Sequence, residues 1–130
     1  MVVHEKPRRL SILGIDDQEV IRELLTSLIS RMGHRIVIAS EGRSGLKLFE
    51  EGHYDLVIAE ADLPGISGWN IAQKVKEISS GTPVIILSGW GLEAEEGSTL
   101  RSNADFVITK PFKMEQLGKV IGAACEMITG

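Results

Sequence analysis

Short apolar runs alternate along the chain with longer stretches in which apolar residues recur at every third or fourth position. The runs are too short for ordinary helices and are rich in β-branched residues, which is typical of strands buried on both faces of a parallel sheet. The longer stretches have the spacing of amphipathic helices that turn one face toward a core. The pattern predicts strands at residues 10–15, 35–39, 56–59, 84–87 and 106–109, and helices at 18–32, 40–51, 69–78, 92–102 and 114–128.

Strands and helices that alternate through short connections predict an α/β fold. We expect a doubly wound, five-stranded parallel sheet covered on both faces, in three α/β/α layers. The segment 92–102 gives the weakest helix signal, because its acids and Gly97 leave little apolar face, and a short or mobile helix is expected there. Residues 1–9 are mixed and charged, so we expect a flexible leader followed by a single domain at 10–130.

The composition adds limits on the class of protein. With 130 residues, 43% of them hydrophobic and 25% charged, the chain has the profile of one soluble globular domain. A net charge of −4 argues against a nucleic-acid-binding groove, and no apolar run approaches the roughly 18 residues of a membrane span. A cytoplasmic location is therefore expected, with the sole cysteine, Cys125, packed in the last helix rather than reactive.

Polar groups follow the predicted strands at the points where they end. Asp16 and Asp17 follow the first strand and Glu60 the third, while Ser88 follows the fourth and Lys110 the fifth. In a parallel sheet these ends meet at one edge, where converging carboxylates need a cation such as Mg²⁺ or Ca²⁺. A lysine and a serine opposite them would suit a phosphoryl group. Each residue alone also fits a structural role, as a helix N-cap, a solvated lysine or a turn residue, but the agreement of several strand ends favours a functional site.

As a set, these motifs make residues 10–128 similar to the receiver domains of two-component response regulators. That family has an acidic pair after its first strand, a phosphorylated aspartate and a Met-Pro-Gly-type turn after its third, Ser or Thr after its fourth and Lys-Pro after its fifth. The matching positions are Asp16-Asp17, Glu60 with Leu63-Pro64-Gly65, Ser88 and Lys110-Pro111. The resemblance implies a flavodoxin-like fold and a signalling role that is not enzymatic.

The resemblance also implies a cofactor and partners. Mg²⁺ would be held by Asp16, Asp17, Glu60 and the backbone carbonyl of Asp62. The implied partner is a histidine kinase or another signalling protein, with no contact to nucleic acid or membrane by this domain, and a homodimer stays open.

The main departure from the family pattern is Glu60, which stands where the phosphorylated aspartate is expected. Its additional methylene moves the carboxylate outward by roughly 1.5 Å, which is enough to spoil in-line attack on a phosphoryl donor. The longer side chain could instead pair with Lys110 or Ser88 and imitate the phosphorylated state. We therefore expect a degenerate receiver that acts through protein contacts.

Further departures concern neighbouring positions. Asp62 is an alternative phospho-acceptor only if strand alternation is broken to turn its side chain inward. Val107 stands where the family has the aromatic ring that reports phosphorylation, and Phe106 falls on the opposite side of the strand. We expect Val107, Trp90 and Pro111 to mark an altered switch and partner surface, with Trp90 either shielding the site or packed in the core.

Two rival functions stay open at this point. One is a phosphorylatable regulator that uses another acceptor such as Asp62. The other is a small α/β cofactor-binding domain that uses the same crevice. Against the second, the loop after the first strand lacks a glycine-rich phosphate cradle, and Asp16-Asp17-Gln18 would repel a flavin phosphate.

Overall fold

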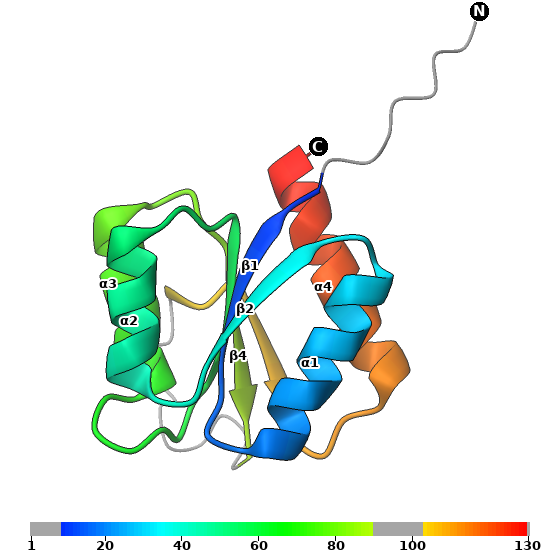
Figure 1. Cartoon of the computed structure of the whole chain (residues 1–130), viewed down its shortest axis with the longest axis horizontal. Helices are drawn as coiled ribbons and strands as arrows, with labels where there is room; N and C mark the ends of the chain where they lie inside the picture. The colour runs from blue at the N-terminus through cyan, green and yellow to red at the C-terminus, as the bar shows by residue number, and fades with distance from the viewer. Residues whose placement is uncertain (1–8, 90–102, 130) are drawn as a thin grey trace, which may run out of the picture.

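The computed structural model describes residues 9–89 and 103–129, and within them it contains a parallel sheet with helices on both faces (Figure 1). The sheet has the strand order β2-β1-β3-β4-β5, and every pair of neighbours is parallel. The strands are β1 (Ser11–Ile15), β2 (Arg35–Ala39), β3 (Leu56–Glu60), β4 (Val84–Ser88) and β5 (Phe106–Thr109). The helices are α1 (Glu19–Arg31), α2 (Gly42–Glu51), α3 (Gly68–Ile78) and α4 (Met114–Thr129).

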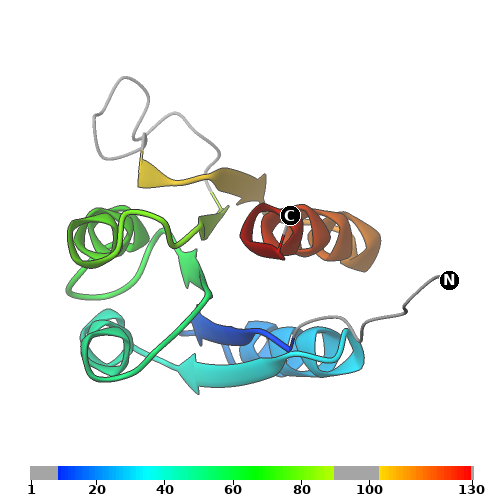
Figure 2. The ribbon, with the colours of Figure 1, turned by 90° about the horizontal axis from the view of Figure 1, so that it is seen from above.

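The helices form two layers, which Figure 2 shows from above: α1 and α4 cover one face of the sheet, and α2 and α3 cover the other. Two apolar clusters fill the spaces between the layers, one on each side. Every residue of β3 and β4 is buried. The predicted doubly wound fold is therefore confirmed, whereas the predicted helix at 92–102 lies outside the described residues.

Two helix positions differ from the apolar pattern. The apolar spacing of their helices would place Val20 and Ile78 on the inner faces, but they are 70% and 53% exposed. Val20 lies in the first turn of α1 and Ile78 is the last residue of α3, so the apolar spacing does not hold at these helix ends. Periodicity alone does not show where a helix passes beyond the layer that it covers.

Side-chain contacts connect several elements at the edge of the sheet where the strands begin. The Asp105 carboxylate accepts the backbone N–H of Val84 at 2.7 Å and pairs with the Lys76 ammonium at 2.8 Å. Lys76 also donates to the carbonyl of Thr82 at 2.7 Å. Because one carboxylate joins the start of β4, the segment before β5 and helix α3, it fixes the β4–β5 register by contacts that the apolar pattern does not reveal.

His34 makes a second connection at this edge. Its Nδ1 accepts the backbone N–H of Leu10 at 3.0 Å, and its Nε2 lies 3.7 Å from Sγ of Cys125 on α4. Burial lowers the pKa of His34, although the nearby Asp55 carboxylate acts in the opposite direction. Cys125 is packed in the apolar cluster on this side of the sheet, as its apolar surroundings predicted, and burial raises the pKa of its thiol.

Candidate functional site

The strand ends bring two buried acids and one lysine together at the opposite edge of the sheet. Asp16 follows β1 and is fully buried, and Glu60 ends β3 and is 5% exposed. Lys110 follows β5, and its Nζ lies 3.3 Å from Oδ2 of Asp16 and forms an ion pair with Oε2 of Glu60. We call these three residues the acidic pocket.

Backbone and side-chain donors hold the remaining oxygens of the acidic pocket. Oδ1 of Asp16 accepts the backbone N–H of Gln18 at 2.9 Å, and Oε1 of Glu60 accepts the N–H of Asp62 at 3.3 Å. Lys110 also donates to Oε1 of Gln18 at 3.0 Å. Three of the four carboxylate oxygens of the two buried acids thus accept hydrogen bonds, while Oε2 of Glu60 accepts none and is only ion-paired with Lys110.

The electrostatics of the acidic pocket follow from burial and from the charge pairing. The pKa of Glu60 is raised because burial penalises the charged carboxylate, even though the Lys110 ammonium and the N–H of Asp62 favour the charged form. Burial alone would lower the pKa of Lys110, but the Glu60 and Asp16 carboxylates outweigh it and raise that pKa. Lys110 is therefore held as a cation by the two acids that it contacts.

The turn after β3 places Glu60 at the pocket. Gly65 has φ +87°, a conformation that a residue with a side chain rarely adopts. Gly68, the first residue of α3, packs directly on the end of β3, and a Cβ there would collide with the carbonyl oxygen of Glu60. Ser67 caps α3 by accepting the N–H of Asn70 at 3.1 Å. The Pro-Gly turn thus lets the backbone of α3 approach the backbone at the end of β3 closely.

Asp17 and Ser88 occupy different surroundings from the pocket acids. Asp17 is exposed and borders a surface hollow of about 580 Å³, together with Arg22, Ser40, Glu41, Arg43, Pro64 and Gly65. Ser88 is buried as the last residue of β4, and its carbonyl accepts the backbone N–H of Lys110 at 2.8 Å. Ser88 therefore helps to position the Lys110 backbone at the pocket.

The predicted switch and partner residues are spread around this edge. The Asp62 side chain is exposed, as strand alternation predicted. Val107 packs in the cluster under α2 and α3, whereas Phe106 packs in the opposite cluster, so the two neighbours face opposite sides of the sheet. Pro111 is exposed, and Trp90 lies outside the described residues.

A hollow of about 370 Å³ lies directly beside the acidic pocket, with Lys110 as a shared wall. Its other lining residues are apolar: Ile21, Leu24, Pro111 and Phe112. We call it the apolar hollow. The apolar hollow and the acidic pocket therefore share the Lys110 side chain.

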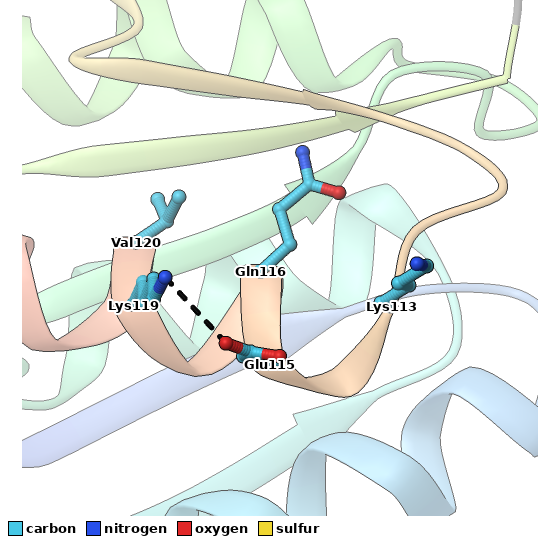
Figure 3. A pocket seen from close by; sticks show the side chains of 5 residues that line it. All are labelled: Lys113, Glu115, Gln116, Lys119 and Val120. Atoms are coloured by element: carbon cyan, nitrogen blue, oxygen red, sulfur yellow. Dashed lines mark ion pairs between the residues drawn. The ribbon is translucent and has the colours of Figure 1, made fainter.

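Figure 3 shows another hollow, on α4, with a different character. Lys113, Glu115, Gln116, Lys119 and Val120 line it. Glu115 and Lys119 form an ion pair at 3.6 Å across one helical turn and are 78% and 77% exposed, as is usual for a solvated helix face. This hollow holds no buried charged group and does not add to the candidate site.

Two contributors to the site were missed by the sequence reasoning. Gln18 contacts Lys110 through its side chain, and Arg22 donates from Nη1 to the backbone carbonyl of Asp16 at 3.0 Å. Their spacing of four residues, which places side chains on one helix face, was the available signal.

The fit of Mg²⁺ to this site follows from its donors. Among residues 9–89 and 103–129, no group of three or more His, Cys, Asp or Glu side chains is arranged to hold a metal ion. The structure brings together Asp16 and Glu60 of the four predicted ligands, but the Lys110 ammonium lies between them and Asp17 is exposed. As arranged, these residues do not fit the ion.

Comparison with known proteins identifies the family. The model for the response regulator receiver domain matches residues 12–122. The chain belongs to the response regulator receiver domain family. It is 33% identical over 110 residues to the probable transcriptional regulator ycf27 of Galdieria sulphuraria, a match that covers 85% of this chain and 43% of that protein. It is also 33% identical over 113 residues to the transcriptional regulatory protein AfsQ1 of Streptomyces coelicolor, a match that covers 87% of this chain and 48% of that protein. The chain spans about half or less of the length of the curated relatives it matches.

Solved structures show the same fold. The response regulator TrrA of Thermotoga maritima, in complex with Mg²⁺-BeF, has a TM-score of 0.80 and 30% identity, covering 88% of this chain and 98% of that one. The receiver domain of sensor histidine kinase PA1611 of Pseudomonas aeruginosa has a TM-score of 0.81 and 19% identity, covering 92% of this chain and 99% of that one, with magnesium in its active-site cleft. The flavodoxin-like receiver fold predicted from the motifs is confirmed.

Family membership fixes the broad role of the receiver domain. It is a signalling module of two-component systems, a class that interacts with histidine kinases and other signalling proteins. The alternative of a small cofactor-binding domain is therefore set aside. Within the described residues, no helix has the length and apolar character needed to cross a membrane.

Proposed function

We propose that this receiver domain signals through protein–protein contacts without phosphoryl transfer to Glu60. The observation that carries the proposal is the ion pair between Glu60 and Lys110, which engages the side chain at the family's acceptor position. A glutamate there reaches roughly 1.5 Å further than an aspartate, so its carboxylate reaches the lysine instead of remaining near the strand. In this proposal Glu60 stands in for part of the charge that a phosphoryl group would bring, and the domain is held in one signalling state.

The partner would read this state at the apolar hollow. Lys110 lines both the hollow and the acidic pocket, so the lysine held by Glu60 also fixes one wall of the contact surface. Val20 lies on the same helix as Ile21 and Leu24 and is 70% exposed, which leaves apolar surface free for a partner. A histidine kinase or another signalling protein is the proposed partner.

The test is phosphate incorporation from labelled acetyl phosphate in the presence of Mg²⁺, measured by intact-mass spectrometry. The wild-type chain should take up no phosphate, while a receiver domain with an aspartate acceptor, treated in parallel, shows that the reagent is active. Glu60→Asp restores the family's residue and should gain measurable uptake. Stable uptake by the wild-type chain that disappears in Glu60→Gln would refute the proposal.

A second candidate function is phosphorylation at Asp62. Its carboxylate is exposed, and its backbone N–H donates to Glu60, so the residue lies at the mouth of the acidic pocket. Phosphopeptide mapping separates the two proposals: phosphate on Asp62, lost in Asp62→Asn and kept in Glu60→Gln, would favour this one.

A further inference from the structure

We infer that Lys110 is the resident counter-ion of the acidic pocket, so that the pocket is complete without Mg²⁺. The inference deepens the proposed function, and it rests on that proposal in taking the acidic pocket as the signalling site of the domain. Its support is the arrangement of donors and charges around Asp16 and Glu60.

The first argument is the occupation of the carboxylate oxygens. Mg²⁺ demands near-octahedral oxygen ligands at about 2.0–2.1 Å and gives up its waters reluctantly. Three of the four oxygens of the two buried acids accept hydrogen bonds, from the backbone N–H groups of Gln18 and Asp62 and from the Lys110 ammonium. The fourth, Oε2 of Glu60, accepts no hydrogen bond but is ion-paired with Lys110. An entering ion would have to displace donors that the fold already holds in place.

The second argument is charge. Two buried carboxylates repel each other unless a cation lies between them, and the Lys110 ammonium lies there. A divalent ion placed among the same oxygens would face this ammonium at close range, so the two cations exclude each other. Asp17 would have to add the missing negative charge, yet its side chain is exposed and borders another hollow.

The third argument is the length of Glu60. Its carboxylate extends far enough from β3 to pair with Lys110, which follows the edge strand β5. Its other oxygen still accepts the N–H of Asp62. The substitution that removes the family's acceptor therefore also supplies the contact that keeps the lysine in the pocket. TrrA and the PA1611 receiver domain, by contrast, are described with magnesium.

The experiment measures thermal unfolding of the whole chain in EDTA and in millimolar MgCl₂, with ionic strength matched by NaCl. A specific site filled at about a hundred times its Kd would raise Tm by roughly 10 °C, whereas we expect the wild-type Tm to stay the same within about 1 °C. Lys110→Met should lower Tm in EDTA, because it leaves two buried carboxylates without their cation, and Mg²⁺ should restore much of the loss. Lys110→Arg keeps the charge and serves as the matched control, with no response to Mg²⁺.

Paramagnetic Mn²⁺ gives a second measurement that needs no variant. The amide NMR signals of Gln18 and Asp62 report on the pocket, because both groups donate to its carboxylates. These signals should keep their intensity when Mn²⁺ is added to the wild-type chain. Their selective broadening, or a Mg²⁺-dependent rise in wild-type Tm that Asp16→Asn abolishes, would overturn the inference, and both readouts hold even where Lys110→Met fails to fold.

Failure of this inference is distinguishable from failure of the proposed function. A wild-type chain that binds Mg²⁺ in the pocket but takes up no phosphate overturns the resident counter-ion and leaves the proposed function standing. A chain phosphorylated on Glu60 overturns the proposed function, whatever its response to Mg²⁺ alone.

Discussion

Gly68→Ala tests how the fold brings Glu60 to the acidic pocket. The added Cβ would collide with the carbonyl oxygen of Glu60 and lie 2.8 Å from its carbonyl carbon and 3.0 Å from Cα of Ala61. These neighbours are backbone atoms of a buried central strand, so they cannot turn aside as a flexible side chain would. Overpacking of this kind costs about 1–3 kcal/mol.

The gain from a better helix former offsets only part of that cost. Replacing glycine by alanine within a helix returns about 0.5–1 kcal/mol, so Gly68→Ala should lose up to about 2.5 kcal/mol of unfolding free energy. Urea unfolding followed by far-UV circular dichroism measures this as a lower midpoint at unchanged slope. The α3–β3 shift should also move the amide NMR signals of Ala61 and Asp62, which lie at the collision and at the pocket.

Gly122→Ala is the matched control for this prediction. Gly122 also lies in a helix, but a Cβ there meets nothing within 4 Å. This variant should be more stable than the wild-type chain by about 0.5–1 kcal/mol, because only the propensity gain applies. If Gly68→Ala were as stable as Gly122→Ala, helix α3 would not approach β3 as closely as the structure indicates, and the account of how Glu60 is positioned would be wrong.

Three further predictions concern other side chains that hold elements of the fold in place. Asp105→Ala should cost about 1–3 kcal/mol in urea unfolding, because a buried backbone donor loses its acceptor, while Glu77→Ala, in a pair whose side chains are 53% and 56% exposed, should stay within about 0.5 kcal/mol. Ser67→Ala should cost about 1 kcal/mol by removing the N-cap of α3, and Ser67→Asn, which keeps an acceptor, should recover most of it. Burial lowers the pKa of His34 in the folded chain, so below about pH 6.5 the unfolded chain binds more protons than the folded one. The contribution of neutral His34 to stability is therefore present above that pH and is lost as the pH falls. The urea midpoint of His34→Gln should accordingly fall less steeply over that pH range than that of the wild-type chain. An equal pH dependence in both chains would contradict the last prediction.

The sequence was sufficient for the strands, because β3 and β4 are buried on both faces and such strands show as unbroken apolar runs. It was also sufficient to bring Asp16, Glu60 and Lys110 to one edge, since parallel strands end at the same side of a sheet. The register of β4 against β5 is different. This register depends on Asp105 and Lys76, which are polar residues outside the strands, so it cannot be predicted from the hydrophobic pattern.

The acidic pair Asp16-Asp17 shows why a sequence motif does not predict where each of its side chains lies. Asp16 and Asp17 are adjacent, and neighbouring side chains of an extended segment point to opposite sides. One carboxylate can therefore be fully buried in the pocket while the other borders the solvent, as the structure has it. Gln18 was missed for the opposite reason: its amide contacts Lys110 only because the chain turns into α1 directly after the pair.

The two edges of the sheet use lysine in different ways, and this difference indicates where the domain can respond to a partner. At the edge where strands begin, Lys76 faces one carboxylate, Asp105, and the pair is balanced. At the other edge Lys110 is shared by Asp16 and Glu60, so one positive charge serves two buried negative charges. Moving Lys76 would only break a structural contact. Moving Lys110 would leave two acids facing each other and would also change a wall of the apolar hollow. Under the proposed function, a protein that binds the hollow would therefore be coupled to the charge state of the pocket through this one side chain.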